Sequence, residues 1–142
     1  MKSTKEPYSF VDKVPDLVNE TAILSYLNTE VVSLSSLDSL REMAFFNEVE
    51  IAGWLNINVK TLRNYKSKNT VIKDYVQEKI VLLLSLFKHG KAVFGDFKVF
   101  SKWLETENFF FDNKAPASFL TTFSGILFID DRLAAIEHGD NV

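Results

Sequence analysis

The chain has 142 residues, of which 46% are hydrophobic and 25% are charged, and its formal net charge is −3. This composition is typical of a globular protein with one domain or two small subdomains, and 13 phenylalanines predict an aromatic core. The absence of cysteine excludes disulfides, thiolate metal sites and cysteine nucleophiles. The longest apolar run, Ile80 to Leu84, is far shorter than the roughly 20 residues of a membrane span. Because no apolar stretch follows the first seven residues, we expect no signal peptide and a cytoplasmic protein without membrane association.

Charge is unevenly distributed along the chain. Residues 1–55 carry a net charge of −5, residues 56–90 carry +5 and residues 91–142 carry −3. Five cations of the middle segment have no acid among them: Lys60, Arg63, Lys66, Lys68 and Lys73. A basic island in an acidic chain suits the binding of nucleic-acid phosphates. The alternative is a solvated lysine-rich surface.

Helical periodicity begins weakly and strengthens after residue 32. The first dozen residues fit an arm, and a helix can begin at Pro15. From Ser33 to Phe46, apolar residues recur at helical spacing, which predicts a helix. A serine oxygen can accept a free amide of the first turn, so Ser35 or Ser36 is the expected N-cap.

Residues 48–66 have the pattern of a helix-turn-helix. Asn47, with Glu50 three residues on, predicts a capping box that opens the first helix, 48–55. Two steeply crossing helices need a small residue at their contact, and Ala52–Gly53 supplies one. We expect the first helix to bury Val49, Leu55 and either Ala52 or Ile51.

The second helix of this motif carries the candidate DNA-reading side chains. Ile57 would fill the turn, Asn58 would cap the helix, and Leu62 and Tyr65 would face the core. The outward-facing residues are then Lys60, Thr61, Arg63 and Asn64. Arginine can contact guanine O6 and N7, and asparagine can contact adenine N6 and N7, so these four residues are candidates for base contacts. Lys66 and Lys68, together with Lys73, are candidates for phosphate contacts.

A long helix is predicted from residue 70 to residue 88. It is apolar on nearly all sides, so it must be buried nearly all round, between two subdomains or in a homodimer interface. Val81, Leu82 and Leu86 form the apolar surplus that predicts the homodimer. His89–Gly90 is predicted to end this helix, with Gly90 as its C-cap.

The remaining residues predict three further helices. Helix 96–104 would bury Phe97, Phe100 and Leu104, and a loop follows at 108–114. Pro116 suits the first turn of a short helix that reaches Leu120. A final helix runs from about 124 to 138, where Gly139 stops it.

Four segments of this region carry a resemblance to a known family: Phe94–Asp96, Trp103–Asn108, Ala115–Leu120 and Ile136–Gly139. Their succession resembles the C-terminal toxin-binding domain of Xre/MbcA/ParS-type antitoxins, which pair with RES-domain toxins that attack NAD. Since the helix-turn-helix pattern resembles the Xre type, the resemblance covers about residues 33–142. One departure is that Phe111-Asp112-Asn113 stands where relatives usually have Leu-Gly-Gly.

The resemblance implies an all-α fold with an Xre-like helix-turn-helix domain at 33–90 and a small helical toxin-binding domain at 91–142. Residues 1–32 would be an N-terminal arm or helix. The implied function is an antitoxin that occludes the NAD pocket of a RES-type toxin and represses its own promoter as a dimer on DNA. The candidate toxin contacts are Pro116, Ser118, Phe119, Arg132, His138, Gly139, Asp140, Asn141 and Val142.

Catalysis, metals and cofactors are not expected. His89 and His138 each precede a glycine at a predicted helix end, which is a structural position. Asp130 and Asp131 are adjacent, so on a helix they point about 100° apart and do not converge as an acid/base pair. No nucleophile elbow, phosphate-binding glycine loop or His-Glu-x-x-His motif is present.

Two alternatives to the antitoxin remain open on the sequence. One is a stand-alone helix-turn-helix transcriptional regulator without a toxin partner. The other is a homo-oligomeric structural module whose helix-turn-helix is vestigial.

Overall fold

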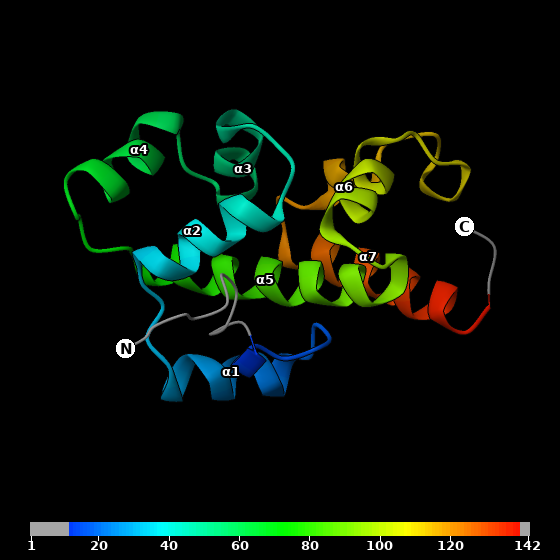
Figure 1. Ribbon diagram of the computed structural model, residues 1–142, viewed down its shortest axis with the longest axis horizontal. Helices are drawn as coiled ribbons and strands as arrows, with labels where there is room; N and C mark the ends of the chain where they lie inside the picture. Colours follow the sequence, from blue (N-terminus) through cyan, green and yellow to red (C-terminus); the bar gives the residue numbers. More distant parts are fainter. Residues whose placement is uncertain (1–11, 140–142) are drawn as a thin grey trace.

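The computed structural model describes residues 12–139, and this part of the chain is helical without strands, which confirms the all-α prediction (Figure 1). The elements are α1 (Glu20–Thr29), α2 (Leu34–Met43), α3 (Glu48–Leu55), α4 (Val59–Ser67), α5 (Asp74–Phe94), α6 (Phe97–Glu105), the 3₁₀ helices η2 (Phe109–Phe111) and η3 (Pro116–Phe119), and α7 (Phe123–Glu137). None of these helices combines the length and the apolarity that crossing a membrane requires.

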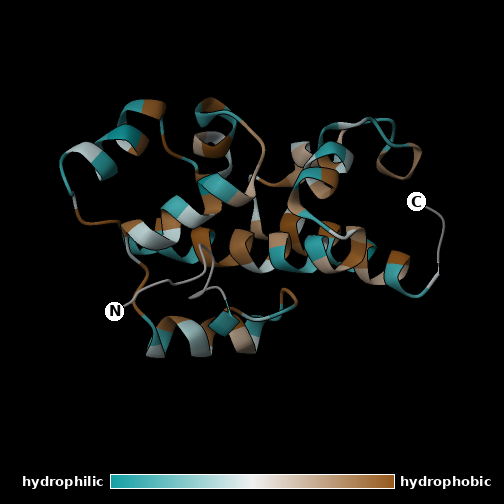
Figure 2. Cartoon of the chain, viewed as in Figure 1, coloured by the Kyte–Doolittle hydropathy of each residue, from teal (hydrophilic) through white to brown (hydrophobic). Residues whose placement is uncertain are grey.

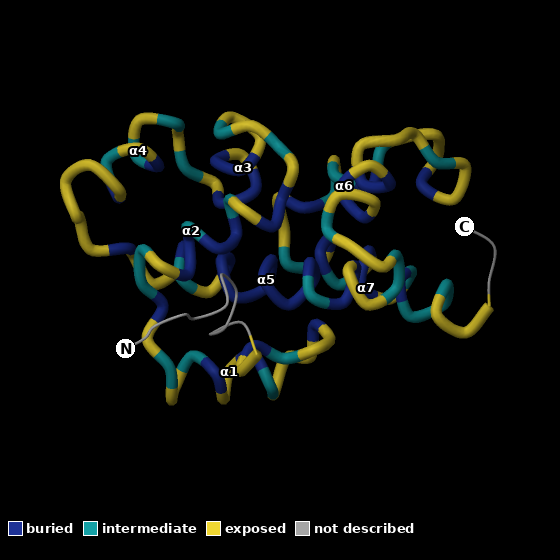
Figure 3. The backbone as a smooth tube through the Cα atoms, viewed as in Figure 1, coloured by how far each residue is buried: buried dark blue, intermediate teal, exposed yellow. Residues whose placement is uncertain are grey.

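The long helix α5 is the centre of the fold. Helices α1, α2, α3, α6 and α7 all pack against it, with α1 on one side and α2 and α6 on the opposite side (Figure 1). The middle of α5 is accordingly buried along its whole circumference (Figure 3). Apolar side chains on every face of one helix are stable only when other elements cover every face.

The homodimer prediction rests on an apolar surface of the long helix that is too large for one chain to cover, and the structure removes that reason. Val81, Leu82 and Leu86 are at most 2% exposed within a single chain. The N-terminal helix α1, about which the sequence said least, packs on α5 and supplies part of the cover. The apolar surplus on α5 therefore gives no support for a homodimer, which stays an untested prediction.

The ends of α5 also differ from the prediction. The helix begins at Asp74 rather than at residue 70, and it continues past His89 and Gly90 to Phe94. Its C-cap is Gly95, at φ 98°, a left-handed conformation that suits glycine. The boundary expected at residues 90–91 thus lies inside α5, and one helix is shared by both halves of the chain.

Gly90 serves close packing and not helix termination. A Cβ atom at residue 90 would lie 2.2 Å from Cδ2 of Phe100, so only glycine admits the Phe100 ring of α6. Phe100 and Leu104 of α6 are fully buried as predicted, whereas Phe97 is only half-buried, with Lys91 Nζ 5.2 Å from its ring centroid.

The start of α2 is a smaller correction. The N-cap is Ser33, not Ser35 or Ser36, and the helix ends at Met43. Ser36 still takes part, because its Oγ accepts the backbone N–H of Ser33 at 3.3 Å.

An aromatic core runs through the molecule, as the phenylalanine content predicted. Adjacent ring centroids lie 4.8–6.0 Å apart along the series Phe46, Trp54, Phe87, Phe100, Trp103 and Phe111. These rings come from α3, α5, α6, η2 and the α2–α3 connection, so a single core joins the two halves of the chain.

Candidate functional site

The two helices of the predicted helix-turn-helix pattern are α3 and α4, joined by residues 56–58. Asn47 Oδ1 accepts the backbone N–H of Glu50 at 2.9 Å, and Glu50 Oε1 accepts that of Asn47 at 3.3 Å. Asn58 Oδ1 accepts the N–H of Thr61 at 2.8 Å. Both predicted caps are therefore confirmed, and they begin the two helices at the expected residues.

The packing of α3 and α4 agrees with the prediction in part, and the clearest differences are at Val49 and Gly53 of α3. Leu62 and Tyr65 are buried, as expected. Val49, however, is 65% exposed, and Trp54 occupies the core instead. Gly53 is exposed, and an added Cβ would meet nothing within 4 Å, so Ala52 alone is the small residue on the buried side.

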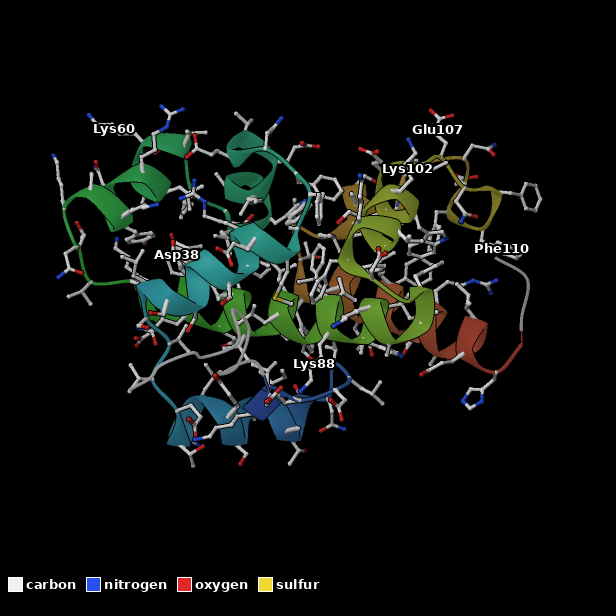
Figure 4. The ribbon with its side chains drawn as sticks, in the orientation of Figure 1. Asp38, Lys60, Lys88, Lys102, Glu107 and Phe110 are labelled. Carbon is white, nitrogen blue, oxygen red and sulfur yellow. The ribbon has the colours of Figure 1, made fainter. Side chains whose placement is uncertain are left out.

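The cations of α4 lie on the surface. Lys60, Arg63, Lys66 and Lys68 are exposed, whereas Thr61 and Asn64 are half-buried. Lys60 extends from α4 away from the body of the molecule (Figure 4). The four exposed cations are free of the core and can approach a polyanion, while the two half-buried residues offer less surface.

A carboxylate of α3 holds Arg63. Arg63 Nε donates to Glu48 Oε1 at 3.2 Å, and Arg63 Nη2 lies 3.2 Å from the same oxygen. The second oxygen, Glu48 Oε2, accepts from Arg41 Nη2 at 2.9 Å. No sequence pattern predicts this cluster, because its three members lie on three different helices. Glu48 fixes one edge of the Arg63 guanidinium and offsets its charge.

The loop after α6 is well defined by hydrogen bonds. Asn108 N–H donates to the Lys114 carbonyl at 3.1 Å, and Asn108 Oδ1 accepts from the Phe110 N–H at 2.9 Å. Asp112 and Asn113 have φ of 61° and 63°, both left-handed. Asx residues tolerate this conformation better than other non-glycine residues. Asp112 and Asn113 thus adopt a backbone conformation that glycine also favours. The loop can therefore form with Asp-Asn where relatives usually have Gly-Gly.

Aromatic side chains collect on the outside of this loop and of α7. Phe109 is 83% exposed, Phe110 is 47% exposed and Phe128 is 48% exposed. Arg132 Cζ lies 4.0 Å from the Phe110 ring centroid, a cation–π distance. Phe119 packs 5.6 Å from Phe128. We call Phe109, Phe110, Phe119, Phe128 and Arg132 the aromatic surface. Phe110 is labelled in Figure 4, and Figure 2 gives the hydropathy along the loop and α7 that carry this surface.

The candidate toxin contacts have different environments. Pro116 is buried, so a partner reaches it only through its neighbours, and the exposed Ser118 donates its hydroxyl to the Ala115 carbonyl at 2.8 Å. Phe119 and Arg132 belong to the aromatic surface. His138, the C-cap of α7, and Gly139 are exposed. Asp140, Asn141 and Val142 lie outside the described residues.

Sequence reasoning missed Phe109, Phe110 and Phe128 as candidate site residues. The available signal was the run of three phenylalanines at 109–111 in a predicted loop, where exposed aromatic residues are unusual. Phe111 of this run is buried, so burial separates it from its two neighbours.

His89 is the hub of a buried polar cluster and does not lie at a helix end. Its Nδ1 lies 2.7 Å from Asp130 Oδ1, and its Nε2 lies 2.9 Å from Glu137 Oε1. Burial alone lowers the pKa of His89, but hydrogen bonds and negative charge from Asp130 and Glu137 outweigh it, so the pKa is raised. Since two carboxylates face both ring nitrogens, the geometry fits an imidazolium that donates twice. Asp130 Oδ2 also accepts the N–H of Val18 at 3.1 Å, which ties the N-terminal segment to α7.

A second polar junction links α3 to α7. The buried Lys79 donates through Nζ to the Trp54 carbonyl at 2.8 Å and to the Thr121 carbonyl at 2.7 Å. Asn56 Nδ2 donates to the same Thr121 carbonyl at 3.1 Å. Burial lowers the pKa of Lys79. The turn between α3 and α4 is thereby joined to the start of α7.

Residues 89–139 match the family model described as the antitoxin Xre/MbcA/ParS C-terminal toxin-binding domain. No curated protein matches the chain. The matched segment begins at the buried His89, ends at the glycine after α7, and contains the whole aromatic surface. The match supports an antitoxin role for this chain, with a toxin as the partner of its C-terminal part.

Proposed function

We propose that the chain is the antitoxin of a type II toxin–antitoxin operon. It neutralises a RES-type toxin that consumes NAD by covering the entrance to the active site, and it represses its own operon by binding promoter DNA. The observation that carries this proposal is the match of residues 89–139 to an antitoxin toxin-binding domain. In this role the protein acts by binding and occlusion, without catalysis of its own.

The neutralising contact is proposed for the exposed side of the C-terminal part. His138 and Gly139 lie at the exposed end of α7, and Asp140–Val142 continue from it. Phe119 and Arg132 lie on α7 or beside it and contribute a second, aromatic contact. A partner that rests on both features would be held at two points of one rigid helix.

Co-expression tests the toxin partner. A RES-domain protein found in a reading frame beside this gene should stop growth and deplete cellular NAD when produced alone, and it should do neither when produced with this chain. Truncation after Ile136 tests the end of α7, since protection should fall while DNA binding persists. If the full-length chain gives no protection and does not co-purify with the toxin, the antitoxin proposal is wrong. Retained promoter binding in that case would favour the stand-alone regulator.

DNA binding is proposed for α4 and the residues after it. Support comes from the exposed cations Lys60, Arg63, Lys66 and Lys68 and from the capped helix pair α3 and α4. Each phosphate neutralised lowers the slope of log affinity against log salt by about 0.9, so promoter affinity should fall steeply with salt.

Two substitutions separate base contacts from phosphate contacts. Arg63→Ala should cost about 1–3 kcal/mol on the promoter if Arg63 contacts a base. Lys68→Ala should weaken all DNA sequences alike and flatten the salt slope. If both variants shift promoter DNA as the wild type does, α4 is not the recognition helix.

A further inference from the structure

We propose that the rings of Phe109, Phe110 and Phe128, with Arg132 over Phe110, anchor the toxin. The toxin supplies an apolar pocket, bordered by basic groups, that receives the exposed Phe109 ring. This inference rests on the proposed antitoxin function and assigns that function to a surface.

The exposed apolar side chains of the matched segment are concentrated here. Across residues 89–139, all of them described, four large hydrophobic side chains are exposed: Val99, Phe109, Phe110 and Phe128. Three of the four belong to the aromatic surface. A contiguous exposed apolar patch has a cost in water, and such patches mark interaction sites. The domain that carries this patch matches a domain described by its binding of toxin.

The patch is continuous because its members contact one another. The rings of Phe109 and Phe110 lie 6.2 Å apart, and Arg132 lies over Phe110. Arg132 is one helical turn from Phe128, and Phe128 packs 5.5 Å from the buried Phe111 of the same loop. Phe109 and Phe110 of the loop and Phe128 of α7 thus form one connected group, which Arg132 and the buried Phe111 hold together.

The surface is held in place before any partner binds. Asn108 and Lys114 pair through their backbones, and the Asn113 N–H donates to the Asn108 carbonyl at 3.0 Å. The Phe111 ring fixes the base of the loop against Trp103, at 5.8 Å. A preorganised aromatic group loses little conformational entropy on binding, which is the property of an interface hot spot.

Charge around the loop defines the chemistry of the partner. Within the loop segment 105–114, the exposed residues Glu105, Glu107 and Asp112 are acidic and Lys114 is the single cation. Two cations of neighbouring helices also lie here, Lys102, whose Nζ is 3.7 Å from Glu105 Oε1, and Arg132 over the Phe110 ring. A complementary surface has an apolar centre and a basic border. A pocket that binds the phosphates of NAD has the same basic character, so this charge fits a toxin of the proposed class.

The test compares Phe109→Ala with Phe45→Ala in the full-length chain. Phe45 is also exposed, at 56%, but it lies before α3 and outside the matched segment, which makes it a matched control. The probe is the toxin that the wild-type chain neutralises on co-expression, and its affinity is measured by titration calorimetry. We expect Phe109→Ala to raise Kd by about 30-fold or more. Phe45→Ala should leave Kd within about twofold.

The results distinguish this inference from the proposed function. If the wild type binds the toxin and Phe109→Ala binds within about twofold of it, the anchor is wrong while the antitoxin function stands. If sedimentation shows that Phe109→Ala abolishes self-association and toxin affinity is unchanged, the surface joins two copies of the chain, which also overturns the inference. If the wild type binds no toxin, the proposed function and this inference fail together. Circular dichroism of the variant, in which an exposed ring is removed, should match the wild type.

Discussion

The same substitution, glycine to alanine, should have opposite effects on stability in two helices of this protein. Gly53 lies within α3 and Gly90 within α5, so both are helix-interior glycines. An added Cβ meets nothing within 4 Å at Gly53. Alanine loses less backbone entropy than glycine and favours the helix, so Gly53→Ala should stabilise the fold by about 0.5–1 kcal/mol.

At Gly90 the clash of the added Cβ costs more free energy than the helix gains from alanine. The added Cβ would lie 2.2 Å from Phe100 Cδ2 and 2.3 Å from Cε2, whereas carbon atoms pack at roughly 3.5–4.0 Å. Phe100 is fully buried between Phe87 at 5.1 Å, Phe94 at 5.9 Å and Trp103 at 6.0 Å, so its ring has no space into which to retreat. Overpacking of a core costs about 1–3 kcal/mol. We expect a net destabilisation of about 2 kcal/mol for Gly90→Ala, after the helix gain is subtracted.

Urea unfolding measures both changes. Trp54 packs against Phe87 and Trp103 packs against Phe100, so tryptophan fluorescence reports on both halves of the core. The m-value should be unchanged, so a shift in midpoint reads directly as a change in stability. If Gly90→Ala is as stable as the wild type, or if both variants move in the same direction, the close approach of α5 and α6 at Phe100 is wrong.

Three further predictions concern charge and backbone. The raised pKa of His89 means that its stabilisation is complete below the unfolded-state pKa of about 6.5 and is lost as pH rises through the folded-state pKa. The urea midpoint of the wild type should therefore fall as pH rises through this range, and in His89→Gln this fall should be absent. An unchanged pH dependence in the variant would contradict the raised pKa of His89. Glu48→Gln should release Arg63 and raise DNA affinity at low salt by up to about fivefold in fluorescence anisotropy. Glu50→Gln changes the same charge in the same turn, so an equal rise in both variants would exclude the release of Arg63 as the cause. Asn113→Val should destabilise the protein by about 1–2 kcal/mol in thermal unfolding because φ is 63°, whereas Asn113→Gly should not.

Much of the secondary structure could be predicted because its signals are local. Asn47 and Asn58 cap the helices that follow them, and each cap bonds an amide three residues away. The stop of α7 could be predicted in the same way: the helix ends at Glu137 with His138 as its C-cap, and Gly139 adopts the left-handed conformation that stops a helix. Apolar spacing placed Leu62 and Tyr65 in the core for the same reason, because residues three apart share a face.

The candidate site could be predicted only in part. Exposure of Lys60 and Arg63 followed from helical spacing, but the ion pair of Arg63 with Glu48 joins residues 15 positions apart and has no periodic signal. The aromatic surface depends on which of three adjacent phenylalanines turns inward. Phe111 turns inward against the rings of Trp103, Phe119 and Phe128, which lie on other elements, so the loop sequence does not specify the choice.

The bounds of α3, the start of α4 and the glycine stop after α7 follow from the local sequence, since caps and helix stops act within about one turn. Only the tertiary structure shows that Gly90 lies inside a helix as a packing residue, because the Phe100 ring of α6 occupies the space that a Cβ at residue 90 would need. It also decided that α5 is covered within one chain, and that His89 meets Asp130 and Glu137 across 41 and 48 residues. Contacts of such separation depend on how whole helices pack, and no local pattern specifies that packing.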